Sequence, residues 1–203
     1  MALRFLALGD SYTIGEGVAP DERWPLQLVA RLRAEGIGIG EPRIVATTGW
    51  TTDELSAAME TADFTPPYAL VTLLIGVNNQ YRGRGVDEYR AQFRDLLQRA
   101  IQLAGGIAAH VIVASIPDWG VTPFAAREGR DAAAVAREID AFNAIASAEA
   151  AGAGAARIDI TAISRAPESR QELVGDGLHP SGAQYARWVE AVLPVARVIL
   201  TGH

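Results

Sequence analysis

Two short stretches near opposite ends of the 203-residue chain hold side chains that could carry out nucleophilic chemistry together. Ser11 follows the first apolar run, and Asp176 and His179 stand three residues apart near the other end. A serine hydroxyl is a weak nucleophile until a base removes its proton and a third group orients that base. Ser11, His179 and Asp176 can fill these three roles. We therefore expect serine-based catalysis if the fold brings the two ends together.

Acyl transfer also needs hydrogen-bond donors where negative charge develops on the acyl oxygen. Gly49 could present a backbone N–H that no side chain shields, and Asn78 could present a side-chain amide. Together with the backbone N–H of Ser11, these groups are the expected oxyanion hole.

Each of these residues also has an ordinary structural explanation. Asp10 and Ser11 belong to the types that commonly cap helices. Gly49 fits a tight turn, and Asn78 fits a turn stabilised by its own side chain. His179 alone fits a surface loop. Their combination favours the functional interpretation, because four separate coincidences at one edge of a sheet would otherwise be needed.

The elements that must position these residues are indicated by five short apolar runs that alternate with longer helical stretches. This alternation is typical of a parallel sheet covered by helices on both faces. In such sheets ligands bind at the carboxyl ends of the strands. The expected strands are residues 4–8, 43–46, 69–75, 110–116 and 156–160.

Helix signals lie between these runs. Pro25 is suited to open the first helix, and Thr51 and Glu54 have capping-box spacing before the second. Ser181 can cap the last helix, which Pro194 is expected to kink or divide. The other two helices are expected at about residues 87–104 and 131–149.

The loop 119–130 is longer than most connections, and it fits a lid over a binding site and a plain surface excursion equally well.

Composition excludes several classes of function. The net charge of −6 argues against binding to nucleic acid, which needs a basic face. The chain contains no cysteine and no lysine, which excludes disulfides, thiolate metal sites and Schiff-base chemistry. His110 and His203 have no partner at metal-ligand spacing, so we expect no metal site. For the serine-based chemistry expected of Ser11, we also expect no organic cofactor. The length fits one domain over residues 1–203.

The start of the chain carries no signal-peptide pattern, and no apolar stretch approaches the ~18 to 20 residues that a membrane-spanning helix needs. We therefore expect a cytoplasmic protein without a membrane span.

The motifs together resemble those of the SGNH hydrolases, also called GDSL-type esterases and lipases. The four residues that give the family its name match Ser11, Gly49, Asn78 and His179, and the Asp-x-x-His block is intact from Asp176. The first block carries Tyr where Leu is commoner, and the third block carries a second Asn where many members have an acidic residue. These differences leave the catalytic set intact, but make the subfamily and substrate uncertain.

The resemblance implies a flavodoxin-like three-layer α/β/α sandwich with a five-stranded parallel sheet. It also implies hydrolysis of carboxylic esters through a Ser-His-Asp triad and an acyl-enzyme. A thioesterase, a lysophospholipase or a carbohydrate O-acetylesterase would use the same machinery, and a flavodoxin-like nucleotide-binding module would use the same sheet edge. The chain has no obvious apolar insertion beyond residues 119–124, so we expect acetyl to hexanoyl esters to be preferred over palmitoyl esters.

Overall fold

The protein, described here by a computed structural model that covers residues 2–202, is built on a sheet of five parallel strands. The strands lie in the order β2-β1-β3-β4-β5, which is the flavodoxin-like order. The predicted fold class is therefore confirmed. Each predicted run holds one strand, and the bounds differ by at most two residues. The strands are β1 (Phe5–Gly9), β2 (Arg43–Ala46), β3 (Leu70–Leu74), β4 (Val111–Ala114) and β5 (Ala156–Ile158).

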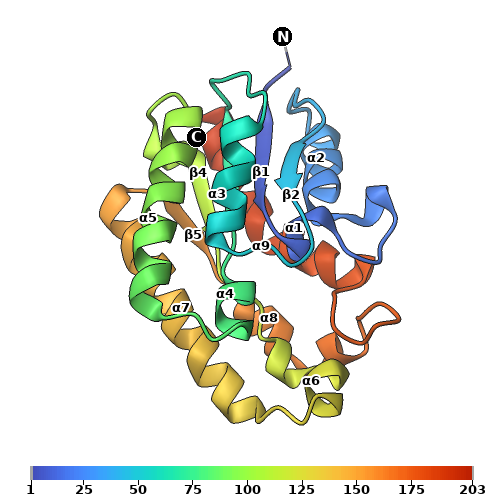
Figure 1. Ribbon diagram of the computed structural model, residues 1–203. Coiled ribbons are helices and arrows are strands. Elements are labelled where there is room, and N and C mark those ends of the chain that lie inside the picture. The colour runs from blue at the N-terminus through green and yellow to red at the C-terminus, as the bar shows by residue number, and fades with distance from the viewer. Residues whose placement is uncertain (1, 203) are drawn as a thin grey trace.

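Five long helices cover the two faces of the sheet (Figure 1). One pair packs together on one face, and the other three helices form the opposite layer. Because both faces are covered, every residue of β1 and β3 is buried, which explains their uninterrupted apolar runs. The pair is α2 (Trp24–Ala34) and α9 (Gly182–Thr201), and the opposite layer is α3 (Thr52–Thr61), α5 (Val86–Leu103) and α7 (Ala132–Ala153).

The predicted helix signals are present in the structure, with one difference. Pro25 lies in the first turn of α2, and the backbone N–H of Thr51 donates to the Glu54 carboxylate at 2.9 Å to complete the capping box of α3. The expectation that Pro194 divides the last helix is wrong, because α9 continues through it. Pro194 lies on the exposed side of α9, where water can satisfy the carbonyl that loses its N–H partner.

Most of the short helices that the sequence analysis did not predict gather where the strands end, at the lower end of the molecule in Figure 1. They have three to five residues, too few to show helical periodicity. Four are α-helical: α1 (Ser11–Ile14), α4 (Val77–Tyr81), α6 (Pro123–Arg127) and α8 (Thr161–Arg165). Four are 3-10 turns: η1 (Pro20–Glu22), η2 (Ala108–His110), η3 (Trp119–Val121) and η4 (Pro167–Arg170).

Candidate active site

Ser11 stands at the carboxyl end of β1, as the first residue of α1. Asp10 caps this helix, and its Oδ1 accepts a hydrogen bond from the backbone N–H of Tyr12 at 3.0 Å. The turn is tight because a Cβ added at Gly9 would lie 2.2 Å from the Thr13 hydroxyl oxygen, so this position has no room for a side chain. Helix capping and the placement of Ser11 at the sheet edge are thus both features of one turn.

Asp176 and His179 belong to one tight turn just before α9. Oδ2 of Asp176 lies 2.6 Å from Nδ1 of His179, and Oδ1 accepts from the backbone N–H groups of Leu178 and His179 at 2.7 and 3.0 Å. Gly177 between them has a φ of +70°, a conformation that glycine adopts without strain. The turn therefore fixes both oxygens of the carboxylate relative to the imidazole.

The charge state of Asp176 follows from these contacts. Burial by itself raises the pKa of Asp176, but the hydrogen bonds from the His179 ring and from the Leu178 and His179 backbone outweigh it, so the pKa lies below its ordinary value. An ionised carboxylate can only accept a hydrogen bond, so Nδ1 of His179 carries the proton and Nε2 is left as an acceptor. A base that must take a proton from a hydroxyl requires this tautomer.

Ser11 and His179 line the same cavity of about 190 Å³, so the structure brings together the two ends of the chain as the sequence analysis expected. The ring of His179 packs against Tyr12, with 5.6 Å between the ring centroids. Among residues 2–202 no hydrogen bond joins Ser11 to His179. In enzymes without substrate such contacts are often long and tighten only in the Michaelis complex.

The two other predicted oxyanion donors line this cavity as well. Gly49 follows β2 with a φ of +87°, and its carbonyl oxygen accepts from Arg82 Nη2 at 2.7 Å. Nδ2 of Asn78, in α4, donates to the carbonyl of Trp50 at 2.9 Å. A primary amide carries two N–H donors, so this contact leaves one for a substrate oxygen.

Asn79 has a structural role, unlike the neighbouring Asn78. It is fully buried, its Oδ1 accepts from the backbone N–H of Thr52 at 3.0 Å, and its Nδ2 donates to the Thr52 hydroxyl at 2.7 Å. It thus ties α4 to the start of α3. Asn78 and Arg82 join α4 and its C-cap to the loop after β2, and these contacts hold the two expected oxyanion donors near each other.

The loop 119–130 is fastened to the turn that holds the imidazole. The backbone N–H of Phe124 donates to the Gly177 carbonyl at 3.0 Å, and Nη2 of Arg127 donates to the Asp176 carbonyl at 2.5 Å. Trp119 and Phe124 of this loop line the cavity, so the loop forms part of its wall.

Sequence reasoning pointed to part of the apolar lining, because residues 119–124 are the one obvious apolar insertion. It gave no signal for Tyr81, since the short helix α4 that carries it was not predicted. The others come from separate segments, and only the folded chain brings them together. The apolar lining comprises Tyr12, Val77, Tyr81, Trp119, Phe124 and Leu178.

Elsewhere, the larger cavity of about 530 Å³ lies between β4, β5, α7 and α8 and contains none of the predicted site residues. Within residues 2–202 no three His, Cys, Asp or Glu side chains gather in a way that could hold a metal ion. His110 lies in η2, and His203 falls outside the described residues. No helix in the described part of the chain is long and apolar enough to span a membrane.

The sheet order places the chain among the three-layer α/β proteins, and a serine beside a His-Asp pair is the arrangement that serine hydrolases use. A profile of the GDSL-like Lipase/Acylhydrolase family matches residues 7–187, and the chain belongs to this family. It is therefore a carboxylic ester hydrolase.

Solved structures with the same fold cover nearly the whole chain. TesA is 22% identical with a TM-score of 0.71, covering 97% of this chain and 99% of TesA. A lipase/acylhydrolase from Enterococcus faecalis is 23% identical with a TM-score of 0.72, covering 97% and 95%. Axe2, an acetylxylan esterase from Geobacillus stearothermophilus, is 21% identical with a TM-score of 0.72, covering 96% and 94%. A comparison with curated proteins gave no significant match.

Proposed function

We propose that this protein hydrolyses small carboxylic esters through an acyl-enzyme on Ser11. The observation that carries the proposal is that Ser11 and His179 line one cavity while Asp176 holds the imidazole in the tautomer that a base needs. The match of the family profile supports the reaction class.

In the first half of the reaction, Nε2 of His179 takes the proton of the Ser11 hydroxyl as Oγ attacks the acyl carbon. The tetrahedral oxyanion accepts hydrogen bonds from the Ser11 and Gly49 backbone N–H groups and from the free N–H of Asn78. When the intermediate collapses, the ester C–O bond breaks and His179 gives its proton to the leaving alcohol.

Water repeats the sequence in the second half. His179 takes a proton from the water as it attacks the acyl-enzyme, and the bond to Oγ breaks. Ser11 regains a proton and the carboxylic acid leaves. Asp176 remains ionised throughout and stabilises the imidazolium that forms in each half.

The lining of the cavity bears on the substrate. Its wall is mostly apolar and aromatic, and its volume of about 190 Å³ suits a short acyl group. One of the structural neighbours is described as an acetylxylan esterase. We therefore propose short-chain esters, among them sugar acetates, as the first substrates to assay.

The test combines labelling with kinetics. A fluorophosphonate is expected to add once per chain, on the peptide that carries Ser11, and to block cleavage of p-nitrophenyl butyrate. Ser11→Ala should lower kcat by about three decades or more. Ser147→Ala, on α7 outside this cavity, is the matched control and should retain wild-type activity. Labelling of a different serine in an active preparation would refute the assignment.

A further inference from the structure

Trp119 is a buried part of the cavity wall. Four aromatic side chains line the cavity: Tyr12, Tyr81, Trp119 and Phe124. Trp119 is only 2% exposed, whereas Tyr81 is 42% exposed. An exposed tyrosine can swing into solvent to enlarge the cavity, but an almost fully buried indole cannot. Tyr12 is buried as well, but it packs against His179 and so belongs to the catalytic end of the cavity. Away from the imidazole, the size limit of the cavity is therefore set on the side of Trp119.

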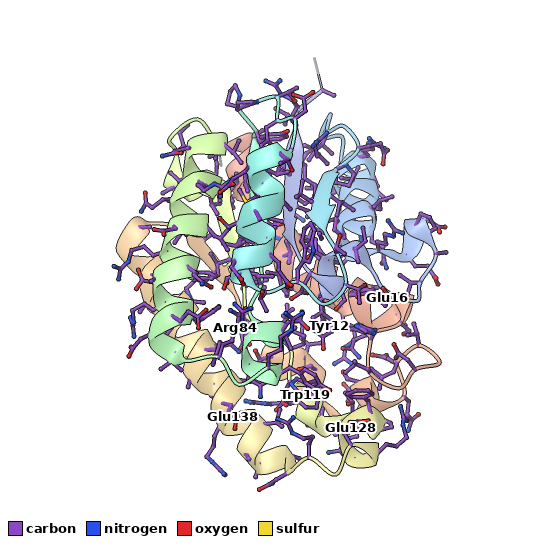
Figure 2. All side chains as sticks on the ribbon, viewed as in Figure 1. Tyr12, Glu16, Arg84, Trp119, Glu128 and Glu138 are labelled. Atoms are coloured by element: carbon purple, nitrogen blue, oxygen red, sulfur yellow. The ribbon has the colours of Figure 1, made fainter. Side chains whose placement is uncertain are left out.

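A chain of two hydrogen bonds holds the indole ring. Nε1 of Trp119 donates to Oε1 of Gln80 at 2.8 Å, and Nε2 of Gln80 donates to Oε2 of Glu138 at 2.6 Å. An indole N–H can only donate and a carboxylate accepts, so the buried amide between them has one favourable orientation. Figure 2 shows Trp119 and Glu138 at the end of the molecule where the strands stop.

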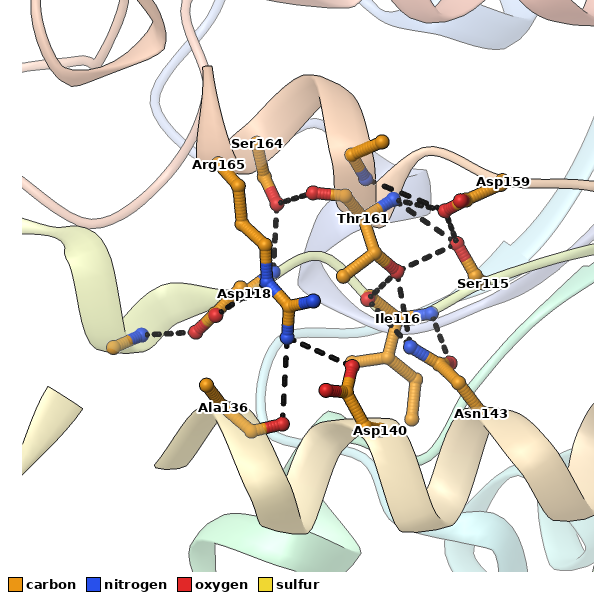
Figure 3. Close-up of polar contacts among 12 residues, drawn as sticks. Ser115, Ile116, Asp118, Ala136, Asp140, Asn143, Asp159, Thr161, Ser164 and Arg165 are labelled. Atoms are coloured by element: carbon orange, nitrogen blue, oxygen red, sulfur yellow. Dashed lines mark hydrogen bonds and ion pairs between the residues drawn. The ribbon is translucent and has the colours of Figure 1, made fainter. Parts of the chain in front are cut away.

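The backbone and one face of Trp119 are held as well. Asp118, the preceding residue, accepts from Nε of Arg165 at 2.8 Å and from the backbone N–H of Gly120 at 2.9 Å, and Figure 3 shows these contacts. The guanidinium of Arg130 stands 5.1 Å from the indole centroid, within the range of a cation–π contact. The ring nitrogen of Trp119, one face of its indole and the adjoining backbone are thus all restrained.

We propose that Trp119 sets the upper size limit of the acyl group, and that Gln80 and Glu138 are positioning residues that keep its indole in place. The inference rests on the proposed function. A cavity of about 150 Å³ holds a benzene-sized ligand, so the cavity of about 190 Å³ here accommodates an acyl group of roughly hexanoyl size. On the side of Trp119, longer chains would have to displace the indole. Trp119 is proposed to limit the acyl group and not the leaving alcohol, because the acyl group stays attached to Ser11 in the acyl-enzyme.

The test measures kcat/KM for p-nitrophenyl acetate, butyrate, hexanoate, octanoate and decanoate. The wild type should decline beyond hexanoate. Trp119→Ala should raise the octanoate-to-acetate ratio at least tenfold, an effect that about two newly buried methylene groups supply. Trp24→Ala is the matched control, because Trp24 is also 2% exposed but lies in α2 and does not line the cavity. This control should leave the ratio unchanged.

The two positioning residues are tested by the same ratio, which a general loss of stability would not change. Gln80→Leu removes both hydrogen bonds, and Glu138→Ala removes the second one, so each should raise the ratio by about threefold. Glu138→Gln keeps an acceptor for the Gln80 amide and should restore the wild-type ratio. If Trp119→Ala does not fold, these variants decide the question.

The possible failures are distinguishable. A folded Trp119→Ala variant with the wild-type ratio would overturn the inference and leave the proposed function intact. A Trp119→Ala variant that changes selectivity only among butyrate esters with alcohols of increasing length would also overturn the inference and leave the proposed function intact. A wild-type protein that cleaves no ester would overturn the proposed function and this inference with it.

Discussion

Replacing Asp10 by Asn should make the protein more stable at alkaline pH. Asp10 is fully buried, and its Oδ2 has no hydrogen-bond partner within residues 2–202. Burial raises the pKa of Asp10 from 3.8 to about 7, although the hydrogen bond from the Tyr12 backbone N–H acts in the opposite direction. Because one pKa unit corresponds to about 1.4 kcal/mol, ionising Asp10 in the folded protein costs about 4 kcal/mol.

The sign follows from linkage. A carboxyl whose pKa is raised by folding contributes stability below its unfolded pKa, and this contribution is lost as the pH rises through the folded pKa. For Asp10 the window runs from about pH 4 to about pH 7. Between pH 5 and pH 8 the free energy of unfolding should fall by about 2.5 kcal/mol because of this group. Asp10→Asn cannot ionise, so the variant should gain about this amount relative to the wild type over the same range.

The assay is urea unfolding at pH 5, 6, 7 and 8, with the slope of free energy against urea checked for constancy. At pH 5 the variant is expected to equal the wild type or to be less stable, because the new amide N–H groups are buried without partners. Asp95→Asn, on the exposed side of α5, controls for the loss of a carboxylate and should show no such pH trend. A constant difference between Asp10→Asn and the wild type from pH 5 to pH 8 would refute the reasoning.

Three further outcomes are expected. Asn78→Ala should lower kcat by about 10² to 10³ with little change in KM, because a donor to the oxyanion acts mainly in the transition state. Asn79→Ala should instead lower the free energy of unfolding by about 1 to 3 kcal/mol in urea titrations, because it leaves the buried N–H of Thr52 unpaired. His179→Ala should lower kcat by about three decades or more, as the loss of a triad member usually does; full activity in this variant would point to another base.

The strands could be predicted closely because a parallel sheet with both faces covered leaves an uninterrupted apolar run in the sequence. β1 and β3, which are buried throughout, show this most clearly. Four of the residues expected at the site, Ser11, Gly49, Asn78 and His179, line one cavity. The alternation of apolar runs and helices predicts the parallel sheet and its ligand-binding edge, whereas the flavodoxin-like arrangement is implied only by the family resemblance. The short helices α1 and α4 escaped prediction, since a single turn leaves no periodic trace.

What the sequence could not indicate depends on contacts between distant segments. Gln80 looks like an ordinary polar residue, yet it lies between Trp119 and Glu138 from two other elements. Asp10 could be recognised as a helix cap, but its complete burial depends on the layers that close over it. The size of the cavity likewise depends on how the loop 119–130 settles on the turn at Gly177.

The place of the site follows from the order of the strands. β1 lies between β2 and β3, so the chain leaves β1 toward one side of the sheet and leaves β3 toward the other. Such a switch point leaves a crevice at the carboxyl edge, and Ser11 and Asn78 stand at its two sides.

The imidazole must come from the far end of the chain, and the packing of α9 against α2 brings it there. The side chain of Gln27 in α2 donates to the carbonyl of Gly182 at 3.0 Å, which fixes the start of α9 three residues after His179. Because α2 follows the segment that carries Ser11, this helix pair helps to hold nucleophile and base in one region. Weakening this contact, as in Gln27→Ala, would therefore act on the geometry of the site before it acts on the fold.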